Sequence, residues 1–421
     1  MNILVLNPGS STLKFGLYQM AGLSQASAAK DSATKDSAIK DSATVLVSGS
    51  IEQIGAPQAK LTLSAAPQKA VNETVAAQTP AQAVEQIIRR LLAYAGENTR
   101  SAMTIEAVGC RVVHGGARFV EPTRVTPSVL DELRALADLA PLHNPVGVAV
   151  LEQVQRSLPE TPVVAVFDTA FHRTLPPVAY TYALPVELCA RYGLRRYGFH
   201  GISHAYVSRQ LIGYLGHGAG GTKIITCHLG SGASVCAVAD GQSVDISMGF
   251  TPLEGLVMDT RVGDVDPGLI LYLIHTVGMT ASAVDSLLNQ ESGLRGLSGL
   301  SGDMREVEQA AQEGNEQAKL ALEIFAYRTR KYIGAFAAAL AGLDALAFTG
   351  GIGEHSASMR SRICQRLAFL GLHLDEARNK TANGRAAMRI SAESSPVQIW
   401  VIPTDEAQEI ARSTVEQLRD L

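Results

Sequence analysis

The sequence predicts an α/β fold made of two related domains. Its 421 residues exceed what one hydrophobic core usually organises. Segments with the two-residue period of strands alternate with segments that carry a helical apolar stripe. Two distant segments, Ile3–Tyr18 and Lys223–Val238, share one pattern of strand, turn rich in Gly and Ser, and strand. A repeated pattern of this kind indicates a duplicated α/β domain.

The expected elements follow from these periods. The first domain begins with strands at Ile3–Leu6 and Leu13–Tyr18, continues with strands at Val45–Ile54 and Leu61–Leu63, and then forms a helix at Ala83–Tyr94. Further along we expect, in order, a strand at Val163–Phe167, a hairpin at Lys223–Val238, one long helix at about Glu306–Leu340, a strand at Leu346–Phe348, a glycine turn at Thr349–Glu354, a strand at Val397–Ile402 and a helix at Glu406–Leu418 capped by Thr404.

Residues 30–44 repeat the pentapeptide KDSAT nearly three times. Low-complexity polar sequence buries too little apolar area to order itself. We therefore expect residues 25–44 to be a surface insertion with no part in catalysis.

Composition excludes several classes of protein. A formal net charge of −4 gives no electrostatic reason to expect binding to nucleic acid or to an anionic membrane. The five cysteines show no CxxC spacing, which argues against a zinc site or a disulfide framework. The apolar opening is too short for a signal peptide, and no apolar run is long enough to span a bilayer. These features favour a cytoplasmic protein without a membrane anchor.

The turn at residues 7–14, N-P-G-S-S-T-L-K, is the first candidate for binding chemistry. Backbone N–H groups, the hydroxyls of Ser10 and Thr12, and the Lys14 ammonium suit phosphate oxygens, and Asn7 offers a neutral oxygen to hydrated Mg²⁺. A turn with only a structural role is the alternative.

Three further side chains are candidates for the reaction site. Arg111 begins R-V-V-H-G-G, in which glycines allow close approach of backbone to a ligand. Asp168 follows the apolar run Val163–Phe167, at the strand end where α/β sheets gather ligands. His200, beside Phe199 in Y-G-F-H-G, could donate a hydrogen bond to a transferring phosphoryl group. A surface arginine and a structural histidine are the alternatives.

Two glycine-rich turns follow apolar strands: H-L-G-S-G at 228–232 and G-G-I-G-E at 350–354. They suit phosphates and a nucleoside, although neither is a Walker A motif or a G-x-G-x-x-G fingerprint. Arg261 precedes G-D-V-D-P-G and would supply a second anion clamp, with a salt-bridged loop as the alternative. Glu406, in T-D-E, could reach a metal ion.

In their order along the chain these segments resemble the acetate kinase family, from residue 2 to about 412. The resemblance also covers P-L-H-N-P at 141–145, F-D-T-A-F-H at 167–172 and T-P-L-E-G-L at 251–256. It implies the fold of the actin, hexokinase and Hsp70 superfamily: two actin-like ATPase (ribonuclease H-like) domains with an interdomain cleft. The domains would be 1–167, completed by the helix 407–421, and 168–406.

The resemblance implies a phosphotransferase that catalyses reversible, direct in-line transfer between ATP and acetate with Mg²⁺ or Mn²⁺, giving ADP and acetyl phosphate, and acts as a homodimer. The residues implied in catalysis are Arg111, Asp168, His200 and Arg261. Substrate acid would contact Arg111, Val113, Leu142, His143, Phe199 and Pro252. ATP and its phosphates would contact Ser10, Thr12, Lys14, His228, Leu229, Gly230, Ser231, Gly232, Asp303, Met304, Arg305, Gly350, Gly351, Ile352, Gly353 and His355. The metal would contact Asn7 and Glu406.

Four positions depart from the family pattern: Ser231, Asp259, His355 and Ala407. Asp259 lies two residues before Arg261 and could pair with it, which would weaken the grip of Arg261 on substrate. Two alternatives stay open, a propionate kinase of the same family and an inactive nucleotide-binding module. Val113, a branched residue in the implied acyl slot, favours the smaller acid.

Overall fold

The computed structural model describes residues 1–9, 11–20, 43–65, 70–97, 104–141, 143–216 and 218–419. Ser10, Leu142 and residues 25–42 of the expected insertion lie outside these ranges. Contacts divide the chain into unit 1, Met1–Ala170 with Asp405–Leu421, and unit 2, Phe171–Thr404. Asp168 and Glu406, given to the second domain by the sequence prediction, therefore belong to unit 1 by their contacts.

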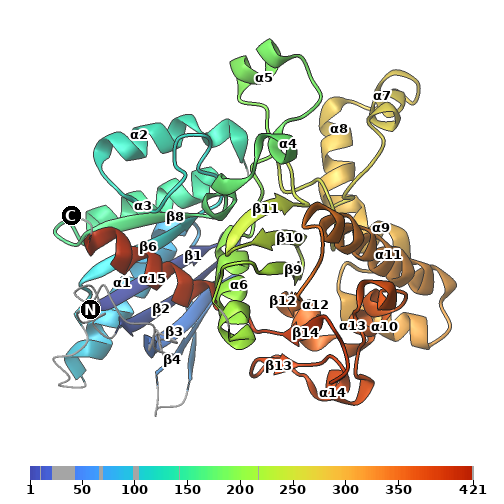
Figure 1. Cartoon of the computed structure of the whole chain (residues 1–421). Helices are drawn as coiled ribbons and strands as arrows, with labels where there is room; N and C mark the ends of the chain where they lie inside the picture. The colour runs from blue at the N-terminus through green and yellow to red at the C-terminus, as the bar shows by residue number, and fades with distance from the viewer. Residues whose placement is uncertain are drawn as a thin grey trace. The chain divides into compact units, whose positions relative to one another are not determined.

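Unit 1 is a sheet with helices, and unit 2 repeats that plan (Figure 1). The described strands and α-helices of unit 1 are β1 (Asn2–Pro8), β2 (Thr12–Met20), β3 (Ala43–Glu52), β4 (Ala59–Ser64), β5 (Val71–Val75), α1 (Pro80–Glu97), β6 (Ala107–Val112), β7 (Thr123–Arg124), α2 (Pro127–Ala135), α3 (Asn144–Ser157), β8 (Val163–Phe167) and α15 (Glu406–Arg419). Those of unit 2 are α4 (Pro177–Tyr180), α5 (Val186–Tyr192), α6 (Gly201–Leu215), β9 (Lys223–Leu229), β10 (Ala233–Ala239), β11 (Gln242–Ile246), α7 (Pro267–His275), α8 (Ala281–Ser286), α9 (Gly293–Ser298), α10 (Met304–Gln312), α11 (Glu316–Ala339), β12 (Ala345–Thr349), α12 (Gly350–His355), α13 (Ala357–Cys364), α14 (Glu376–Thr381), β13 (Met388–Arg389) and β14 (Gln398–Val401).

The two sheets share one pattern of strand pairing. In unit 1 the order is β5-β4-β3-β2-β1-β6-β8-β7, with β2 antiparallel to β1 and with β1, β6 and β8 parallel. In unit 2 the order is β11-β10-β9-β12-β14-β13, with β10 antiparallel to β9 and with β9, β12 and β14 parallel. The predicted hairpins and the predicted α/β class are thus confirmed.

Strand alternation divides the sheet of unit 1 into two apolar faces. One face presents Val108, Cys110 and Val112 of β6 to a core that includes side chains of α1 and α3. Gly109 lies on the other face, where a Cβ atom would come within 2.3 Å of Thr414 Oγ1 of α15. Helix α15 therefore packs directly on this second face, as Figure 1 shows for the dark red helix on the blue strands.

Three predicted elements are wrong in detail. The long helix is two helices, α10 and α11, because Gly314 adopts a φ of +99° and Asn315 caps a new helix by accepting from the Ala318 N–H. The glycine turn after β12 is the short helix α12. The first turn of α15 is capped by Asp405, whose carboxylate accepts from the Gln408 N–H, rather than by Thr404.

In the described part of the chain, no helix combines the length and apolarity needed to cross a bilayer.

Candidate active site

The carboxyl ends of three parallel strands bring polar side chains together in unit 1. Because Val5 pairs with Gly109, and Gly109 with Val164, the alternating positions Asn7, Arg111 and Asp168 all follow on the face covered by α15. Glu406 is the first residue of α15. We call these four residues the Arg111 cluster.

Hydrogen bonds fix the Arg111 guanidinium on several sides. Its Nε and Nη2 donate to the two carboxylate oxygens of Asp168, at 3.0 Å to Oδ1 and 2.6 Å to Oδ2. Its Nη1 donates to Asn7 Oδ1 at 3.3 Å and to the Pro8 carbonyl at 3.2 Å. The Asp168 side chain is 3% exposed and the Arg111 side chain 18%. A bidentate pair with such burial sets the plane of the guanidinium.

Charge in this cluster favours a permanently cationic Arg111. Burial by itself would lower the pKa of the guanidinium, but the charge of Asp168 and, more weakly, that of Glu406 outweigh burial and raise the pKa. The Asn7 Nδ2 donates to Glu406 Oε2 at 2.8 Å, which ties β1 to the start of α15. The cluster thus places one fixed cation beside carboxylate and amide oxygens.

The other predicted residues of unit 1 lie around the same strand ends. Lys14 is the cross-strand partner of Asn7, so the two side chains share a face of the hairpin. The Thr12 hydroxyl lies close to Gly9 of the turn: a Cβ atom on Gly9 would be 2.8 Å from Thr12 Oγ1. Val113 is buried directly after β6, and His143 directly precedes α3.

In unit 2, Gly232 brings His200 and Arg261 together. A Cβ atom on Gly232 would lie 3.0 Å from His200 Nε2 and 3.2 Å from Arg261 Nη2. Only glycine therefore leaves both side chains unobstructed here. Arg261 Nη1 donates to the Pro252 carbonyl at 2.8 Å. Burial lowers the pKa of Arg261, and the charge of Asp259 offsets part of this effect.

Hydroxyl and imidazole groups contact His200 on the side of its Nδ1 atom. His200 has a left-handed φ of 57° and directly precedes α6. Its Nδ1 lies 2.9 Å from Ser234 Oγ, which lies 2.8 Å from His204 Nε2. The ring also stacks on that of His228, with 4.4 Å between centroids. We call His200, His204, His228, Ser234 and Arg261 the His200 cluster.

One cavity of about 920 Å³ in unit 2 collects eight of the residues predicted to contact the nucleotide. These are Gly230, Ser231, Asp303, Met304, Arg305, Gly351, Ile352 and His355. Gly350 packs closely against β9: its φ is +76°, and a Cβ there would lie 2.7 Å from the Leu229 carbonyl oxygen. His228, Leu229, Gly232, Gly350 and Gly353 are not among the lining residues. A role in binding a nucleotide stays a prediction for the eight lining residues as well as for these five.

The expected pairing of Asp259 with Arg261 is wrong. The Asp259 carboxylate accepts from the backbone N–H of Thr260 at 2.6 Å, and among the described side chains it acts on Arg261 through its charge alone, without a hydrogen bond. Asp259 instead lines the cavity. A side chain satisfied by its own loop leaves Arg261 available to a ligand.

Sequence reasoning missed several contributors. The cavity is also lined by Thr260, Arg295, Leu300, Ser301, Gly302, Glu308 and Ser356. The run L-S-G-L-S-G-D before α10 was a signal for part of this set, because Gly and Ser dominate ligand-binding turns. Ser234 was detectable too, since it pairs with His228 across the hairpin and so shares its face.

Buried histidines make the stability of unit 2 sensitive to acid. Burial lowers the pKa of His172 to about 4, against a partial rise from its hydrogen bond to the Phe199 carbonyl, and burial also lowers the pKa of His204. Because the unfolded chain takes up these protons first, stability is complete above about pH 6.5 and falls as the pH drops towards 4.

We expect protonation of His172 alone to lower the free energy of unfolding by about 2 kcal/mol when the pH falls from 7.5 to 5. Urea unfolding followed by the fluorescence of Trp400, the single tryptophan, measures unit 2. His172→Gln should flatten this pH dependence. An equal slope in wild type and variant would contradict the assignment.

Comparison with known proteins identifies the family. The Acetokinase family profile matches residues 2–412. The acetate kinase of Phocaeicola vulgatus is 46% identical, with 99% of each chain covered. The crystal structure of Porphyromonas gingivalis acetate kinase is similar with a TM-score of 0.87, 39% identity and 99% of each chain covered. A propionate kinase from Francisella tularensis gives a TM-score of 0.85, with 37% identity and 99% coverage of each chain. These likenesses confirm the predicted α/β fold, which the chain shares with solved structures of an acetate kinase and a propionate kinase. The chain therefore belongs to the Acetokinase family.

Proposed function

We propose that this protein is an acetate kinase, which transfers the γ-phosphoryl group of ATP reversibly to acetate and gives ADP and acetyl phosphate. The observation that carries the proposal is the Arg111 cluster, because a reaction between two anions needs a fixed cation beside ligands for a metal. Membership of the Acetokinase family and full-length similarity to acetate kinases support the choice of substrates.

The proposed chemistry needs no strong base, since a carboxylate is already a nucleophile. Arg111 and Arg261 hold the acetate carboxylate and the migrating phosphoryl group, so that attack proceeds in line without a phosphoenzyme. Asp168 keeps the Arg111 fork in one plane.

His200 donates a hydrogen bond to the phosphoryl oxygens in the proposed mechanism. If the Ser234 hydroxyl donates to Nδ1, the neutral ring carries its hydrogen on Nε2, the nitrogen beside Gly232 and Arg261. The Ser234 oxygen then accepts from His204 Nε2, which satisfies this buried histidine as well. The relay thus supports Nε2–H as the donor.

The residues present fit a magnesium ion bound together with a nucleotide. Among the described residues no group of three or more His, Cys, Asp and Glu side chains could hold a metal alone. Mg²⁺ commonly takes one or two protein oxygens and completes its shell with phosphates and water. Glu406 and Asn7 would hold the ion, which would neutralise charge on the transferring phosphates.

Propionate is the second candidate substrate, because the similar Francisella structure is named a propionate kinase. A hydroxamate assay for acyl phosphates, with purified protein, MgATP and acetate, propionate or butyrate, tests both proposals. We expect the highest kcat/KM with acetate. A preference for propionate would favour the second candidate. ATP binding without any acyl phosphate would instead support an inactive nucleotide-binding module.

We also propose that the protein is a homodimer through unit 2. Helix α7, P-G-L-I-L-Y-L-I-H, has no buried residue, and its Leu269, Leu271 and Tyr272 are about half exposed. Val178 of α4 and Val186 of α5 are 93% and 80% exposed. With no Asp, Glu, Lys or Arg on α7, its apolar surface fits a second copy of itself better than a charged partner.

Leu271→Asp should therefore halve the mass measured by light scattering after size-exclusion chromatography, because a carboxylate cannot be buried unpaired in an apolar interface. Leu320→Asp, at a similarly exposed leucine of α11, is the matched control and should keep the wild-type mass. A Leu271→Asp protein with wild-type mass would exclude α7 from the interface.

The cytoplasm is the proposed location. All five cysteines are free thiols and four are buried, which is usual in a reducing compartment.

A further inference from the structure

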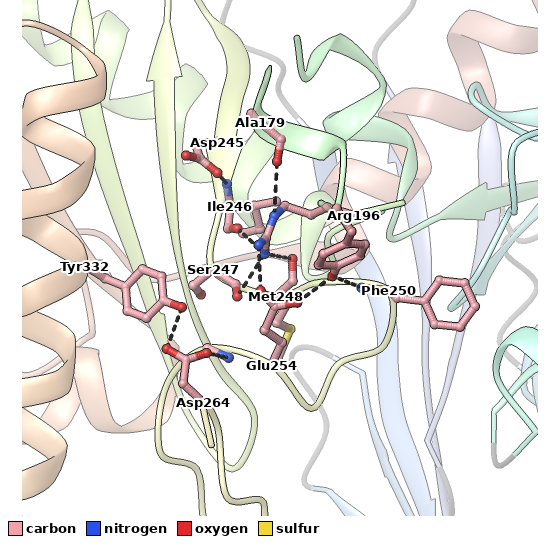
Figure 2. Close-up of polar contacts among 12 residues, drawn as sticks. Ala179, Arg196, Asp245, Ile246, Ser247, Met248, Phe250, Glu254, Asp264 and Tyr332 are labelled. Atoms are coloured by element: carbon pink, nitrogen blue, oxygen red, sulfur yellow. Dashed lines mark hydrogen bonds and ion pairs between the residues drawn. The ribbon is translucent and has the colours of Figure 1, made fainter. Parts of the chain in front are cut away.

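The guanidinium of Arg196 donates hydrogen bonds to several protein groups (Figure 2). Its Nη1 donates to the carbonyl oxygens of Ile246 at 3.0 Å, Ser247 at 3.3 Å and Met248 at 3.0 Å. Its Nη2 donates to Glu254 Oε1 at 2.6 Å, and its Nε to the Ala179 carbonyl at 3.3 Å. The side chain is 16% exposed. All three nitrogens of Arg196 thus donate to the protein, and these bonds fix its neighbours relative to one another.

Glu254 joins Arg196 to a tyrosine. Its second oxygen, Oε2, accepts from the Tyr182 hydroxyl, and the Tyr182 oxygen accepts from the Phe250 N–H at 2.9 Å. Burial, and then the Glu254 carboxylate, raise the pKa of Tyr182, so its hydroxyl stays protonated and keeps donating at working pH. We call Arg196, Glu254 and Tyr182 the loop clamp, because together they hold residues 246–254 at both ends.

The loop clamp leaves no room for a side chain at its centre. A Cβ atom on Gly249 would lie 1.7 Å from Glu254 Oε2 and 2.2 Å from the Tyr182 hydroxyl oxygen. The Gly249 carbonyl accepts from the N–H groups of Tyr197 and Gly198, at 3.1 and 3.2 Å. The clamped loop is therefore hydrogen-bonded directly to the segment that leads into Phe199 and His200.

Two residues of the implied acyl slot, Phe199 and Pro252, lie on the two segments that the loop clamp joins. Phe199 lies on the first, three residues after Arg196, and Pro252 lies on the second, two residues before Glu254. The Pro252 carbonyl also receives the hydrogen bond from Arg261 Nη1. The clamp thus bears on the acyl walls and on one anion-binding side chain.

We propose that the loop clamp positions Pro252 against Phe199 and thereby sets the length of acid that the enzyme accepts. The inference rests on the proposed function and assigns Arg196, Glu254 and Tyr182 as positioning residues. One methylene group in a close-fitting apolar slot changes kcat/KM by about 10- to 200-fold, so even a small release of the loop is measurable as a change in selectivity.

Tyr182→Phe and Glu254→Gln test the clamp with minimal change of shape. Each should raise the ratio of kcat/KM for propionate to that for acetate by about fivefold or more, because a released loop admits the extra methylene. The KM for MgATP should stay at its wild-type value, since no clamp residue lines the cavity described above. A general loss of folding would not produce this pattern.

Tyr332→Phe is the matched control. The Tyr332 hydroxyl donates to Asp264 Oδ2 at 2.8 Å (Figure 2), and Asp264 Oδ1 accepts from the Gly255 N–H. Tyr332 therefore supports Gly255, the residue directly after Glu254, but it is not a member of the loop clamp. The control should keep the wild-type acid selectivity and thermal midpoint within error.

Three outcomes would overturn the inference: wild-type selectivity in both clamp variants, an equal shift in the Tyr332→Phe control, or failure of both clamp variants to fold, which would make the clamp an element of stability alone. Failure of the proposed function looks different, because the wild-type protein would then form no acyl phosphate from any acid.

Discussion

Arg111→Lys is expected to reduce the kcat of acetyl phosphate formation by about 100-fold or more. Lysine keeps the positive charge, but its ammonium cannot bond both Asp168 oxygens, Asn7 and the Pro8 carbonyl as the fork does. The loss of one oriented donor set at a reacting anion is of the size seen for oxyanion-hole donors. Steady-state kinetics with MgATP and acetate measure the effect.

Lysine is preferable to alanine at this position. Alanine would leave the Asp168 carboxylate buried without its partner, which costs about 3 to 5 kcal/mol and mixes folding with catalysis. Arg118→Lys serves as the control in the same unit, because its pair with Glu132 is solvent-exposed. A folded Arg111→Lys enzyme with more than a third of wild-type kcat would remove Arg111 from the mechanism.

Arg261→Ala should lower kcat/KM for acetate by about 100- to 1,000-fold, or about 2.7 to 4 kcal/mol of transition-state stabilisation. The reason is the position of Nη2, which lies beside His200 Nε2 over Gly232. Within the described part of the chain this guanidinium donates to the Pro252 carbonyl alone, so we expect the variant to stay folded. Circular dichroism and a thermal midpoint establish this before kinetics.

The control for Arg261→Ala is Arg378→Ala, which removes a partly exposed arginine paired with Glu393 and Asp375 in the same unit. The double variant with Arg111→Lys adds a sharper test. If both arginines hold one migrating group, their effects are not additive, and the double variant should lose much less than the product of the two single losses. Simple additivity would argue that the two cations serve separate steps.

The Arg111 cluster follows from sequence more directly than the His200 cluster. Asn7, Arg111 and Asp168 each stand at the end of a readable apolar strand, and a period of two puts them on one face once the strands are parallel. No such rule connects Arg196 with Glu254 or Tyr182. Their partners are distant in sequence and become neighbours only through tertiary packing, so the loop clamp was not predictable.

Local pattern failed where tertiary contacts outweigh propensity. Residues 350–353, G-G-I-G, are poor helix formers, yet α12 forms because Glu354 accepts from the Gly350 N–H at 2.9 Å and from the Thr404 N–H at 3.0 Å. The break between α10 and α11 was readable, since glycine followed by asparagine ends one helix and caps another. The alanine-rich sequence on both sides of Gly314 nevertheless favoured the prediction of one continuous helix.

The packing of α15 has a consequence for biosynthesis. Residues 1–170 leave the ribosome before unit 2, but the face of their sheet that carries Ile3, Val5 and Gly109 is covered by α15, which is translated after unit 2. Domains that are contiguous in sequence can fold as they emerge. The sheet of unit 1 cannot bury this apolar face until α15 has been translated. We therefore expect unit 2 to complete its core first, and we expect chaperones to be needed mainly for the N-terminal sheet.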